Sequence, residues 1–310
     1  MKTFIIKSIL LLFSLFVLDR VVAFVLEKFF YKQYHGDDYV SIQLFDSTQA
    51  DILILGSSRA SHHYIPDTIT KYTSHSVYNG GRDNMGIHYI YSALNIVSKR
   101  YKPQYVILDL IPHAFLKGNQ DQEHYFATQI ATLLPFAQKH SSIYEDVKKL
   151  NPREYYISKL SKAYAYNGLL GTIAQNAFTH FGHTQEKGYE PLSGSIDSAT
   201  YTKAIFPYPA TDISIDSTAF QYLEKCIALC LKNNMKPILC FSPNYFPSPS
   251  YAALMQHFET IVQKHHIALF DFSHNEQFTL HPLWFYDELH LNHAGASVYS
   301  KILIDRNVFP

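Results

Sequence analysis

Ser58, Asp287 and His290 have the side chains of a serine nucleophile, an orienting acid and a general base. A serine hydroxyl is a weak nucleophile and needs a base within hydrogen-bond reach, usually a histidine with a pKa near neutrality. The histidine needs an acid that holds its tautomer and stabilises the imidazolium. Asp287 and His290 are three residues apart, so a helical turn would place both on one face. These residue types indicate acyl transfer or hydrolysis through a serine.

Each motif has other readings when it stands alone. The turn from Gly56 to Ser58 is of a common strand-to-helix kind, and Asp287 with His290 suits a metal, although no third ligand has convincing spacing. The turn lacks the Gly-Lys-Ser/Thr ending of a phosphate loop. It also departs from the G-x-S-x-G elbow, because residue 60 is alanine. We interpret His62 and His63 as surface or wall residues.

The elements that must position these residues have the pattern of an alternating α/β fold. Short apolar runs between turn residues predict buried strands at 51–55, 76–78, 105–110, 237–241 and 267–272. Helical spacing and capping residues predict helices at 66–72, 85–100, 214–234, 251–265 and 294–304. Strands that alternate with helices imply a parallel sheet with right-handed crossovers.

Polar clusters follow three of the predicted strands, and a fourth cluster precedes the last helix. They are Gly56-Ser57-Ser58-Arg59, Asn79-Gly80-Gly81-Arg82, Ser242-Pro243-Asn244 and Asp287-Glu288-Leu289-His290-Leu291-Asn292. Ligands of open parallel sheets collect outside the carboxyl ends of the strands. We therefore expect the Ser58 hydroxyl and the His290 ring to meet at this edge.

Residues 1–30 are predicted to be a transmembrane anchor. Apolar residues extend from Phe4 to Leu26, interrupted by Asp19 and Arg20, which is close to the roughly 20 residues that cross a bilayer. Lys2 and Lys7 precede the main apolar run from Ile9 to Leu18 and favour a cytoplasmic N-terminus. The prediction is a single-pass protein of the cytoplasmic (inner) membrane with an extracytoplasmic or periplasmic C-terminal domain. A signal peptide cleaved after Val21-Val22-Ala23 and a buried amphipathic helix are the alternatives.

The remaining chain is predicted to be a stalk at 31–50 and one α/β domain at 51–310. The stalk is polar and without clear periodicity. Residues from about 120 to 210 break the strand and helix alternation, so we expect an inserted helical cap over the carboxyl edge, ending in a loop from Gly188 to Thr211. Its aromatic side chains would line a glycan cleft or pack the cap's own core; they are Tyr155, Tyr156, Tyr164 and Tyr166.

Composition limits the function classes. Hydrophobic residues make up 47% of the chain and charged residues 17%, so a sizeable core is expected. The formal net charge is zero, which argues against a nucleic-acid partner because such proteins normally have a basic face. Three cysteines, an odd number, argue against a complete disulfide framework. The oligomeric state does not follow from composition.

In order and placement, three segments resemble the SGNH/GDSL hydrolase superfamily: ILILGSSRASHH, YNGGRDNMG and YDELHLNHAGA. The resemblance extends from about residue 50 to 305, apart from the expected cap. It is strongest to a membrane-anchored envelope branch that includes proteins of alginate acetylation and teichoic-acid D-alanylation. It implies a flavodoxin-like, three-layer α/β/α fold with the cap inserted and the transmembrane helix in front.

The resemblance also implies residue roles. Ser58 matches the nucleophile, with Ser57 in place of the usual aspartate, and Asp287 and His290 match the acid and the base. The backbone N–H groups of Ser58 and Gly81 match two donors to the oxyanion.

A further motif of the family is missing from this chain. Gly-x-Asn-Asp is expected after the strand at 105–110, but the chain reads Asp109-Leu110-Ile111-Pro112-His113. Loss of one oxyanion donor raises a barrier by about 3 kcal/mol. Either Asn244, Asn79 or Arg82 replaces the missing asparagine, or activity is weak or lost.

The expected function is therefore that of an extracytoplasmic serine esterase or O-acyltransferase acting on acyl esters of envelope or extracellular glycans. This chemistry requires no metal and no organic cofactor. The main alternative is an anchored binding or assembly protein that keeps the fold with a degraded site. A phosphoesterase that uses the same three side chains is a third possibility.

Overall fold

The structure is a computed structural model that describes residues 1–117, 129–178, 186–196, 214–245 and 251–309. Its internal contacts divide the chain into two units. The first, here the helical unit, combines Met1–Ile42 with Glu123–Thr184. The second, here the α/β unit, combines Gln43–Gln122 with Gln185–Pro310.

The α/β unit is built on a parallel sheet of five strands in the order β2-β1-β3-β4-β5. The strands are β1 (Ile52–Gly56), β2 (Val77–Asn79), β3 (Tyr105–Asp109), β4 (Lys236–Phe241) and β5 (Ala268–Asp271). All five coincide with the runs predicted from sequence. This order is that of flavodoxin-like doubly wound folds, in which the connections run outward from the first strand in both directions.

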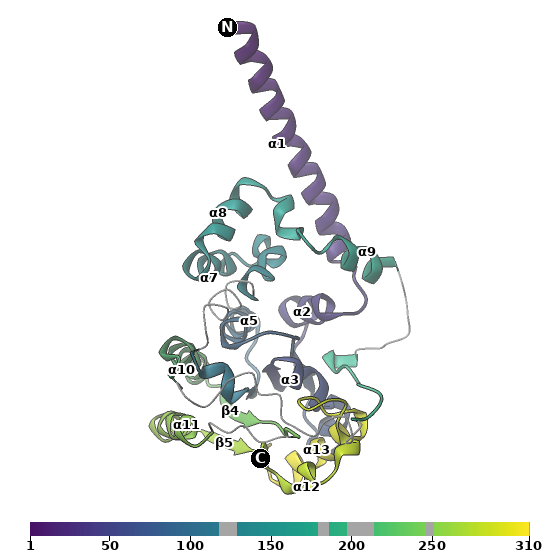
Figure 1. The fold of residues 1–310 in the computed structure, drawn as a ribbon, viewed down its shortest axis with the longest axis vertical. Coiled ribbons are helices and arrows are strands. Elements are labelled where there is room, and N and C mark those ends of the chain that lie inside the picture. The colour runs from purple at the N-terminus through teal and green to yellow at the C-terminus, as the bar shows by residue number, and fades with distance from the viewer. Residues whose placement is uncertain (118–128, 179–185, 197–213, 246–250, 310) are drawn as a thin grey trace. The chain divides into compact units, whose positions relative to one another are not determined.

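Helices lie on both faces of this sheet. The described helices of the unit are α3 (Ser58–His63), α4 (Pro66–Thr73), α5 (Ile87–Arg100), α10 (Ser217–Lys232), α11 (Tyr251–His265), α12 (Glu276–Thr279) and α13 (His293–Asp305). α13 contacts α3 and α4, whereas α5 contacts α10. Figure 1 shows α10 and α11 on one side of β4 and β5, with α3 and α13 on the other. The arrangement is that of three α/β/α layers.

Capping and burial explain the main elements. α10 begins where the Asp216 side chain accepts hydrogen bonds from the N–H groups of Thr218 and Ala219, as its sequence position predicted. β1 and β3 are buried along their whole length, because helices cover both faces of a parallel sheet. The short helix α3, directly after β1, was not predicted.

The packing of α13 against α3 is what brings the last polar cluster to the first strand. The Tyr64 and Tyr299 hydroxyls lie 3.2 Å apart in the core, and the Ile65 N–H donates to Ser300 Oγ at 3.0 Å. Both tyrosine side chains are fully buried. The loop that enters α13 is therefore held alongside the N-terminal turn of α3.

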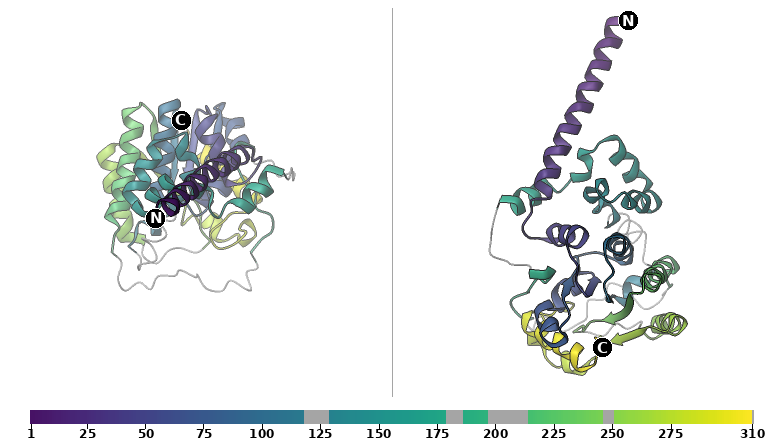
Figure 2. Two further views of the ribbon diagram at one scale, coloured as in Figure 1. Left: turned by 90° about the horizontal axis from the view of Figure 1, so that it is seen from above. Right: turned by 180° about the vertical axis from the view of Figure 1, so that it is seen from behind.

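The helical unit surrounds the C-terminal part of one long helix, α1 (Lys2–Phe30). Its other described helices are α7 (Ser142–Leu150), α8 (Pro152–Leu160) and α9 (Leu170–Phe178), with 3-10 turns η2 (Leu134–Gln138) and η3 (Ala163–Tyr166). Phe30 is fully buried and packs edge-on against Phe136 and Tyr166. Figure 2 shows the N-terminal part of α1 clear of the other helices.

α1 is long and apolar enough to cross a membrane, and only 6% of its most apolar stretch is buried. A core helix of a soluble protein would be mostly buried, so the buried amphipathic alternative is not supported. The Asp19 and Arg20 side chains, which interrupt the apolar run, bond to each other at 2.7 Å. Asp19 also accepts hydrogen bonds from Ser161 Oγ, the Lys162 N–H and the Ala163 N–H.

The structure differs from two parts of the domain prediction. The expected stalk contains helix α2 (Asp37–Asp46), whose Leu44 and Phe45 are fully buried, and Arg100 donates to both of their carbonyl groups. The inserted segment forms one unit with α1 and ends at Thr184 rather than near 210. Tyr166 is fully buried in the core of this unit, which is the packing role expected as the alternative to a cleft.

Other parts of the cap prediction stay predictions. Residues 118–128 and most of the expected loop from Gly188 to Thr211 lie outside the described residues. The expected cover of the carboxyl edge by the cap is likewise a prediction.

Candidate active site

Ser58 lies where β1 turns sharply into α3. β1 ends at Gly56, Ser57 has extended backbone angles, and Ser58 is the first residue of α3. A Cβ on Gly56 would lie 2.7 Å from the Asp109 carbonyl oxygen, so the turn passes too close to β3 for any other residue. The sheet order reverses at β1, which places Ser58 at the switch point where doubly wound folds bind ligands.

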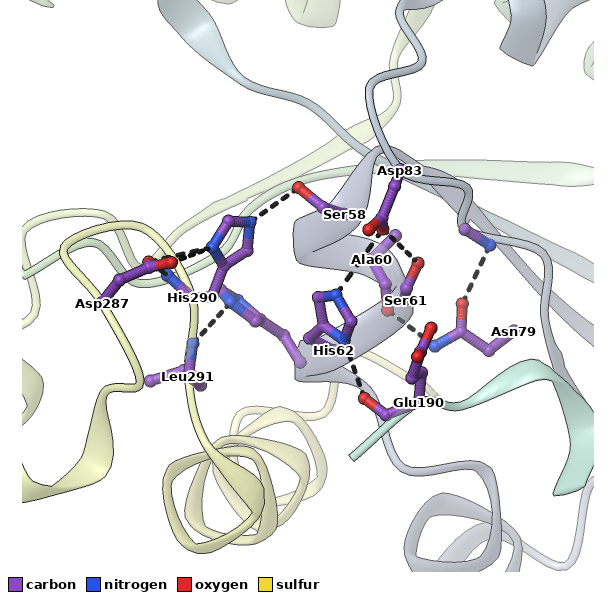
Figure 3. A network of polar contacts seen from close by, with 12 residues as sticks. Ser58, Ala60, Ser61, His62, Asn79, Asp83, Glu190, Asp287, His290 and Leu291 are labelled. Atoms are coloured by element: carbon purple, nitrogen blue, oxygen red, sulfur yellow. Dashed lines mark hydrogen bonds and ion pairs between the residues drawn. The ribbon is translucent and has the colours of Figure 1, made fainter. Parts of the chain in front are cut away.

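The structure brings the Ser58 hydroxyl, the His290 ring and the Asp287 carboxylate into one hydrogen-bonded row (Figure 3). Ser58 Oγ lies 2.7 Å from His290 Nε2, and His290 Nδ1 lies 2.9 Å from each Asp287 oxygen. A carboxylate accepts only, so the ring proton is on Nδ1 and the Nε2 lone pair faces the hydroxyl. This is the arrangement in which a histidine takes a proton from serine.

Asp287 is held in place by the backbone of its own loop. Its Oδ1 accepts the N–H groups of Leu289 at 2.9 Å and of His290 at 2.8 Å. Partial burial acts to raise the pKa of the Asp287 carboxyl, but the His290 ring and the two N–H groups outweigh it and lower that pKa. The carboxylate therefore stays ionised and aimed at the ring.

The loop that carries Asp287 and His290 is closed at its base. Phe285 pairs with Leu291 in an antiparallel bridge, and the Tyr286 N–H donates to the His290 carbonyl at 2.8 Å. The Phe285 and Leu291 side chains are fully buried, which anchors both ends of the loop in the core.

His63 ties this loop to α3, contrary to its interpretation as a surface or wall residue. The Leu291 N–H donates to His63 Nε2 at 2.9 Å, and the His63 side chain is fully buried. Burial lowers the pKa of His63 well below its usual value, so the ring is neutral and can accept.

His62 belongs to a second cluster of polar contacts, beside the row formed by Ser58, His290 and Asp287. The sequence did not predict this cluster. Its Nδ1–H donates to the Glu190 carbonyl at 2.7 Å, and its Nε2 lies 3.6 Å from Asp83 Oδ1. The His62 and His290 rings lie 5.6 Å apart, edge to face. Burial acts to lower the pKa of His62, but Asp83 and the Glu190 carbonyl outweigh it and raise that pKa. Figure 3 shows His62 between His290 and Asp83.

The segment YNGGRDNMG has a structural role, which corrects the oxyanion roles expected for Gly81 and Asn79. Asn79 Nδ2 donates to the carbonyl groups of Ala60 and Tyr64, so both amide hydrogens are used and Asn79 is no oxyanion donor. Asn79 Oδ1 accepts the Gly81 N–H at 3.0 Å, so this N–H is already engaged. A Cβ on Gly81 would lie 2.4 Å from the Ser61 nitrogen, so this glycine permits the close approach to α3.

The end of β3, where Gly-x-Asn-Asp was expected to follow, is structural as well. Asp109 is buried at the end of β3, where its carboxylate accepts from the Tyr64 hydroxyl at 2.8 Å and from the N–H and hydroxyl of Ser242. Asp109 is 1% exposed, so its carboxylate supports the core beneath the site and does not face a ligand in solvent.

Of the three proposed replacements, Asn244 is the one whose amide oxygen is held by another side chain. The buried Arg59 guanidinium donates to Asn244 Oδ1 and to the Leu110 carbonyl. Since arginine has no acceptor, Asn244 must turn its oxygen to Arg59 and its NH₂ group away. The Tyr245 N–H donates to the Glu288 carbonyl at 3.1 Å, which places Asn244 beside the loop of Asp287. Arg82 is buried, and its backbone N–H donates to the Gly56 carbonyl.

Among the described residues, no group of three or more histidine, cysteine or acidic side chains is placed to hold a metal ion. Asp287 and His290 instead bond to each other. The alternative in which these two residues form a metal site has no third ligand in this part of the chain.

Comparisons with known proteins add little beyond this geometry. No protein-family model matches the chain, and no curated protein matches it. Among solved structures, the chain is similar to one from Streptococcus pneumonia described as a "putative platelet activating factor", at 12% identity and a TM-score of 0.38. That match covers 97% of this chain and 98% of the other.

Proposed function

We propose that this protein is a serine ester hydrolase or O-acyltransferase of the SGNH/GDSL type. The row Ser58–His290–Asp287 is the observation that carries the proposal. The three sequence blocks and the strand order β2-β1-β3-β4-β5 support it. We propose acyl esters of envelope or extracellular glycans as the substrate class.

In the proposed reaction, Ser58 Oγ attacks the ester carbonyl carbon while its proton passes to His290 Nε2. The new C–O bond gives a tetrahedral intermediate, and Asp287 stabilises the imidazolium that has formed. His290 then gives its proton to the departing alkoxide as the ester bond breaks. Water, or the hydroxyl of a sugar acceptor, attacks the acyl-serine by the same route in reverse and releases the acid or the new ester.

The negative oxygen of the intermediate needs hydrogen-bond donors. Ser58 is the first residue of α3, so its backbone N–H has no acceptor within the helix. We assign the second donor to the Asn244 NH₂ group, because Arg59 directs the Asn244 oxygen the other way. This assignment replaces the Gly81 N–H and Asn79, which bond to each other.

We further propose that α1 is a retained single-pass anchor in the cytoplasmic (inner) membrane, with the α/β unit on the extracytoplasmic side. Ala23 is 4% exposed, and Asp19 binds the loop before η3. Cleavage after Ala23 would remove Asp19 from these contacts and open the packing around α1. A signal peptide that is cleaved and discarded would not require such contacts with the folded chain.

A fluorophosphonate probe on the full-length protein in detergent tests the chemistry. Wild type should be labelled, and Ser58→Ala should abolish labelling. Ser57→Ala is the matched control, because Ser57 is the neighbouring serine and its side chain caps no N–H of α3. Equal labelling of Ser58→Ala and wild type would end the proposal. Turnover of acetyl esters without turnover of phosphate esters would exclude the phosphoesterase alternative.

A binding or assembly protein with a degraded site is the second candidate. The observation that favours it is the hydrogen bond from the Gly81 N–H to Asn79, which occupies a donor that the family uses. Absence of labelling in a folded wild-type protein would establish this candidate over the enzyme.

A further inference from the structure

Exposed apolar side chains on α1 continue past the charged pair Asp19–Arg20. Val21, Phe24 and Val25 are 54%, 60% and 45% exposed. With a rise of 1.5 Å per residue, the stretch from Phe4 to Val25 is about 32 Å long, close to the ~30 Å hydrocarbon core of a bilayer. Lipid around these side chains would therefore reach the level of Asp19 and pass beyond it.

The protein itself satisfies the charged pair at that level. Asp19 accepts from Ser161 Oγ at 2.5 Å and from the Lys162 N–H at 2.9 Å, in addition to Arg20. Polar groups within a bilayer must be satisfied internally, because no water is present to bond to them. These contacts allow the pair to lie below the lipid headgroups.

The same contacts place the C-terminus of α8 at the level of Asp19 and Arg20 on α1. Arg20 Nη2 lies 3.4 Å from the Leu160 carbonyl at the C-terminus of α8. The Leu160 side chain is 79% exposed, and Tyr156, one turn earlier on the same face, is 63% exposed. Figures 1 and 2 show α8 at the level of the C-terminal part of α1 in two opposite views. An exposed leucine and tyrosine beside a membrane-crossing helix lie where lipid is the neighbour.

The chain that follows α8 has the composition of a membrane-facing segment. From Ala163 to Phe178 it contains no aspartate, glutamate, lysine, arginine or histidine. This stretch includes α9, which contacts α1 and leaves Leu170 57% exposed. Exposed apolar side chains of this kind mark sites of association, and the contact of α9 with the proposed membrane anchor favours lipid as the partner.

We propose that the helical unit dips into the outer layer of the bilayer that α1 crosses, with Tyr156 and Leu160 as its lipid contacts. This inference rests on the proposed membrane anchor and not on the ester chemistry. The partner is the phospholipid surface itself: Leu160 enters the edge of the hydrocarbon, and Tyr156 lies at the headgroup level that tyrosine favours. The helical unit therefore contacts the membrane through α8 as well as through α1.

Spin labels on single introduced cysteines test the proposal in full-length protein, reconstituted into vesicles of phosphatidylethanolamine and phosphatidylglycerol. The three native cysteines are fully buried, so they leave the introduced thiol as the reactive one. Leu160→Cys and Tyr156→Cys probe the contact, Phe13→Cys probes the anchor, and Glu145→Cys on the exposed side of α7 is the water control. The measurement is collision of each label with oxygen, which dissolves in lipid, and with a nickel chelate, which stays in water.

We expect the oxygen-to-nickel ratio at Leu160 and Tyr156 to exceed that at Glu145 several-fold and to stay below that at Phe13. Ratios at Leu160 and Tyr156 equal to that at Glu145, with Phe13 in lipid, would overturn the proposed lipid contact of α8 and leave the anchor intact. A Phe13 label that the nickel chelate reaches freely would overturn both the anchor and the lipid contact of α8. Neither result would alter fluorophosphonate labelling of Ser58, so the ester chemistry is tested separately.

Discussion

The backbone N–H of Leu291 donates to Nε2 of His63 across 2.9 Å, inside the core. This bond joins α3, which carries Ser58, to the loop that carries Asp287 and His290. The distance between nucleophile and base therefore depends on a second histidine that does not face the substrate.

Replacement of His63 by leucine should destabilise the protein and impair catalysis together. The Leu291 N–H would be left buried without an acceptor, which costs about 1–3 kcal/mol. Urea unfolding followed by circular dichroism measures this loss. His63→Gln is the control that keeps an acceptor, and it should recover part of the stability. Unchanged stability in His63→Leu would show that the bond does not hold the loop.

Asp287→Asn should leave the fold intact and nearly abolish turnover. An amide can present an N–H to His290 Nδ1, which favours the wrong ring tautomer, and in a serine protease the equivalent change lowers kcat about 10⁴-fold. Acetyl-ester hydrolysis is the assay. A matched control is Glu288→Gln in the same loop, whose side chain has no described role at the site. Equal loss in both variants would remove the assigned role from Asp287.

The lowered pKa of Asp287 also predicts a change in acid stability. Its folded-state pKa lies below the ordinary value of 3.8, so its stabilising contribution is present above that pH and is lost as pH falls through the folded pKa. The Tm difference between wild type and Asp287→Asn should therefore shrink as the pH is lowered below 4. A difference that grows on acidification would contradict this sign.

Asn244→Asp separates the proposed oxyanion donor from the support of Arg59. The aspartate keeps an oxygen for the Arg59 guanidinium but loses the NH₂ group. Loss of one oxyanion donor typically lowers kcat about 10²–10³-fold, and we expect this fall in kcat with little change in KM or Tm. Asn244→Ala is expected to lose stability as well, because Arg59 loses an acceptor. Full activity in Asn244→Asp would exclude the side chain as a donor.

The raised pKa of His62 predicts that the stability of the protein depends on pH near neutrality. Its folded pKa is raised above 6.5 by Asp83 and the Glu190 carbonyl, against the effect of burial. The added stability is full below pH 6.5 and disappears as pH rises through the folded pKa. The Tm difference between wild type and His62→Gln should be larger at low than at high pH. Asp83→Asn should reduce that dependence, and a His62→Gln difference that grows with pH would contradict the assignment.

Local sequence patterns predicted most of the α/β scaffold. Short apolar runs mark β1 and β3 because both faces of a parallel strand are buried, and helical spacing with Asp216 as cap marks α10. The α1 helix is evident from its length and apolarity. α2 was missed because Asp37, Asp38 and Asp46 make the segment polar, whereas tertiary contacts bury its Leu44 and Phe45.

The amino-acid sequence by itself determined which side chains are chemically able to form the site and that Ser58 follows the first strand. Only the tertiary structure decided which of them meet. Asn79 and Asn244 are equally plausible donors in the sequence, but the amide of Asn79 is consumed by the backbone around α3. His63 and Asp19 likewise acquire their roles from partners at Leu291 and Ser161. The reason is physical: a polar group is free or engaged according to the donors and acceptors that folding brings to it, and local sequence does not contain them.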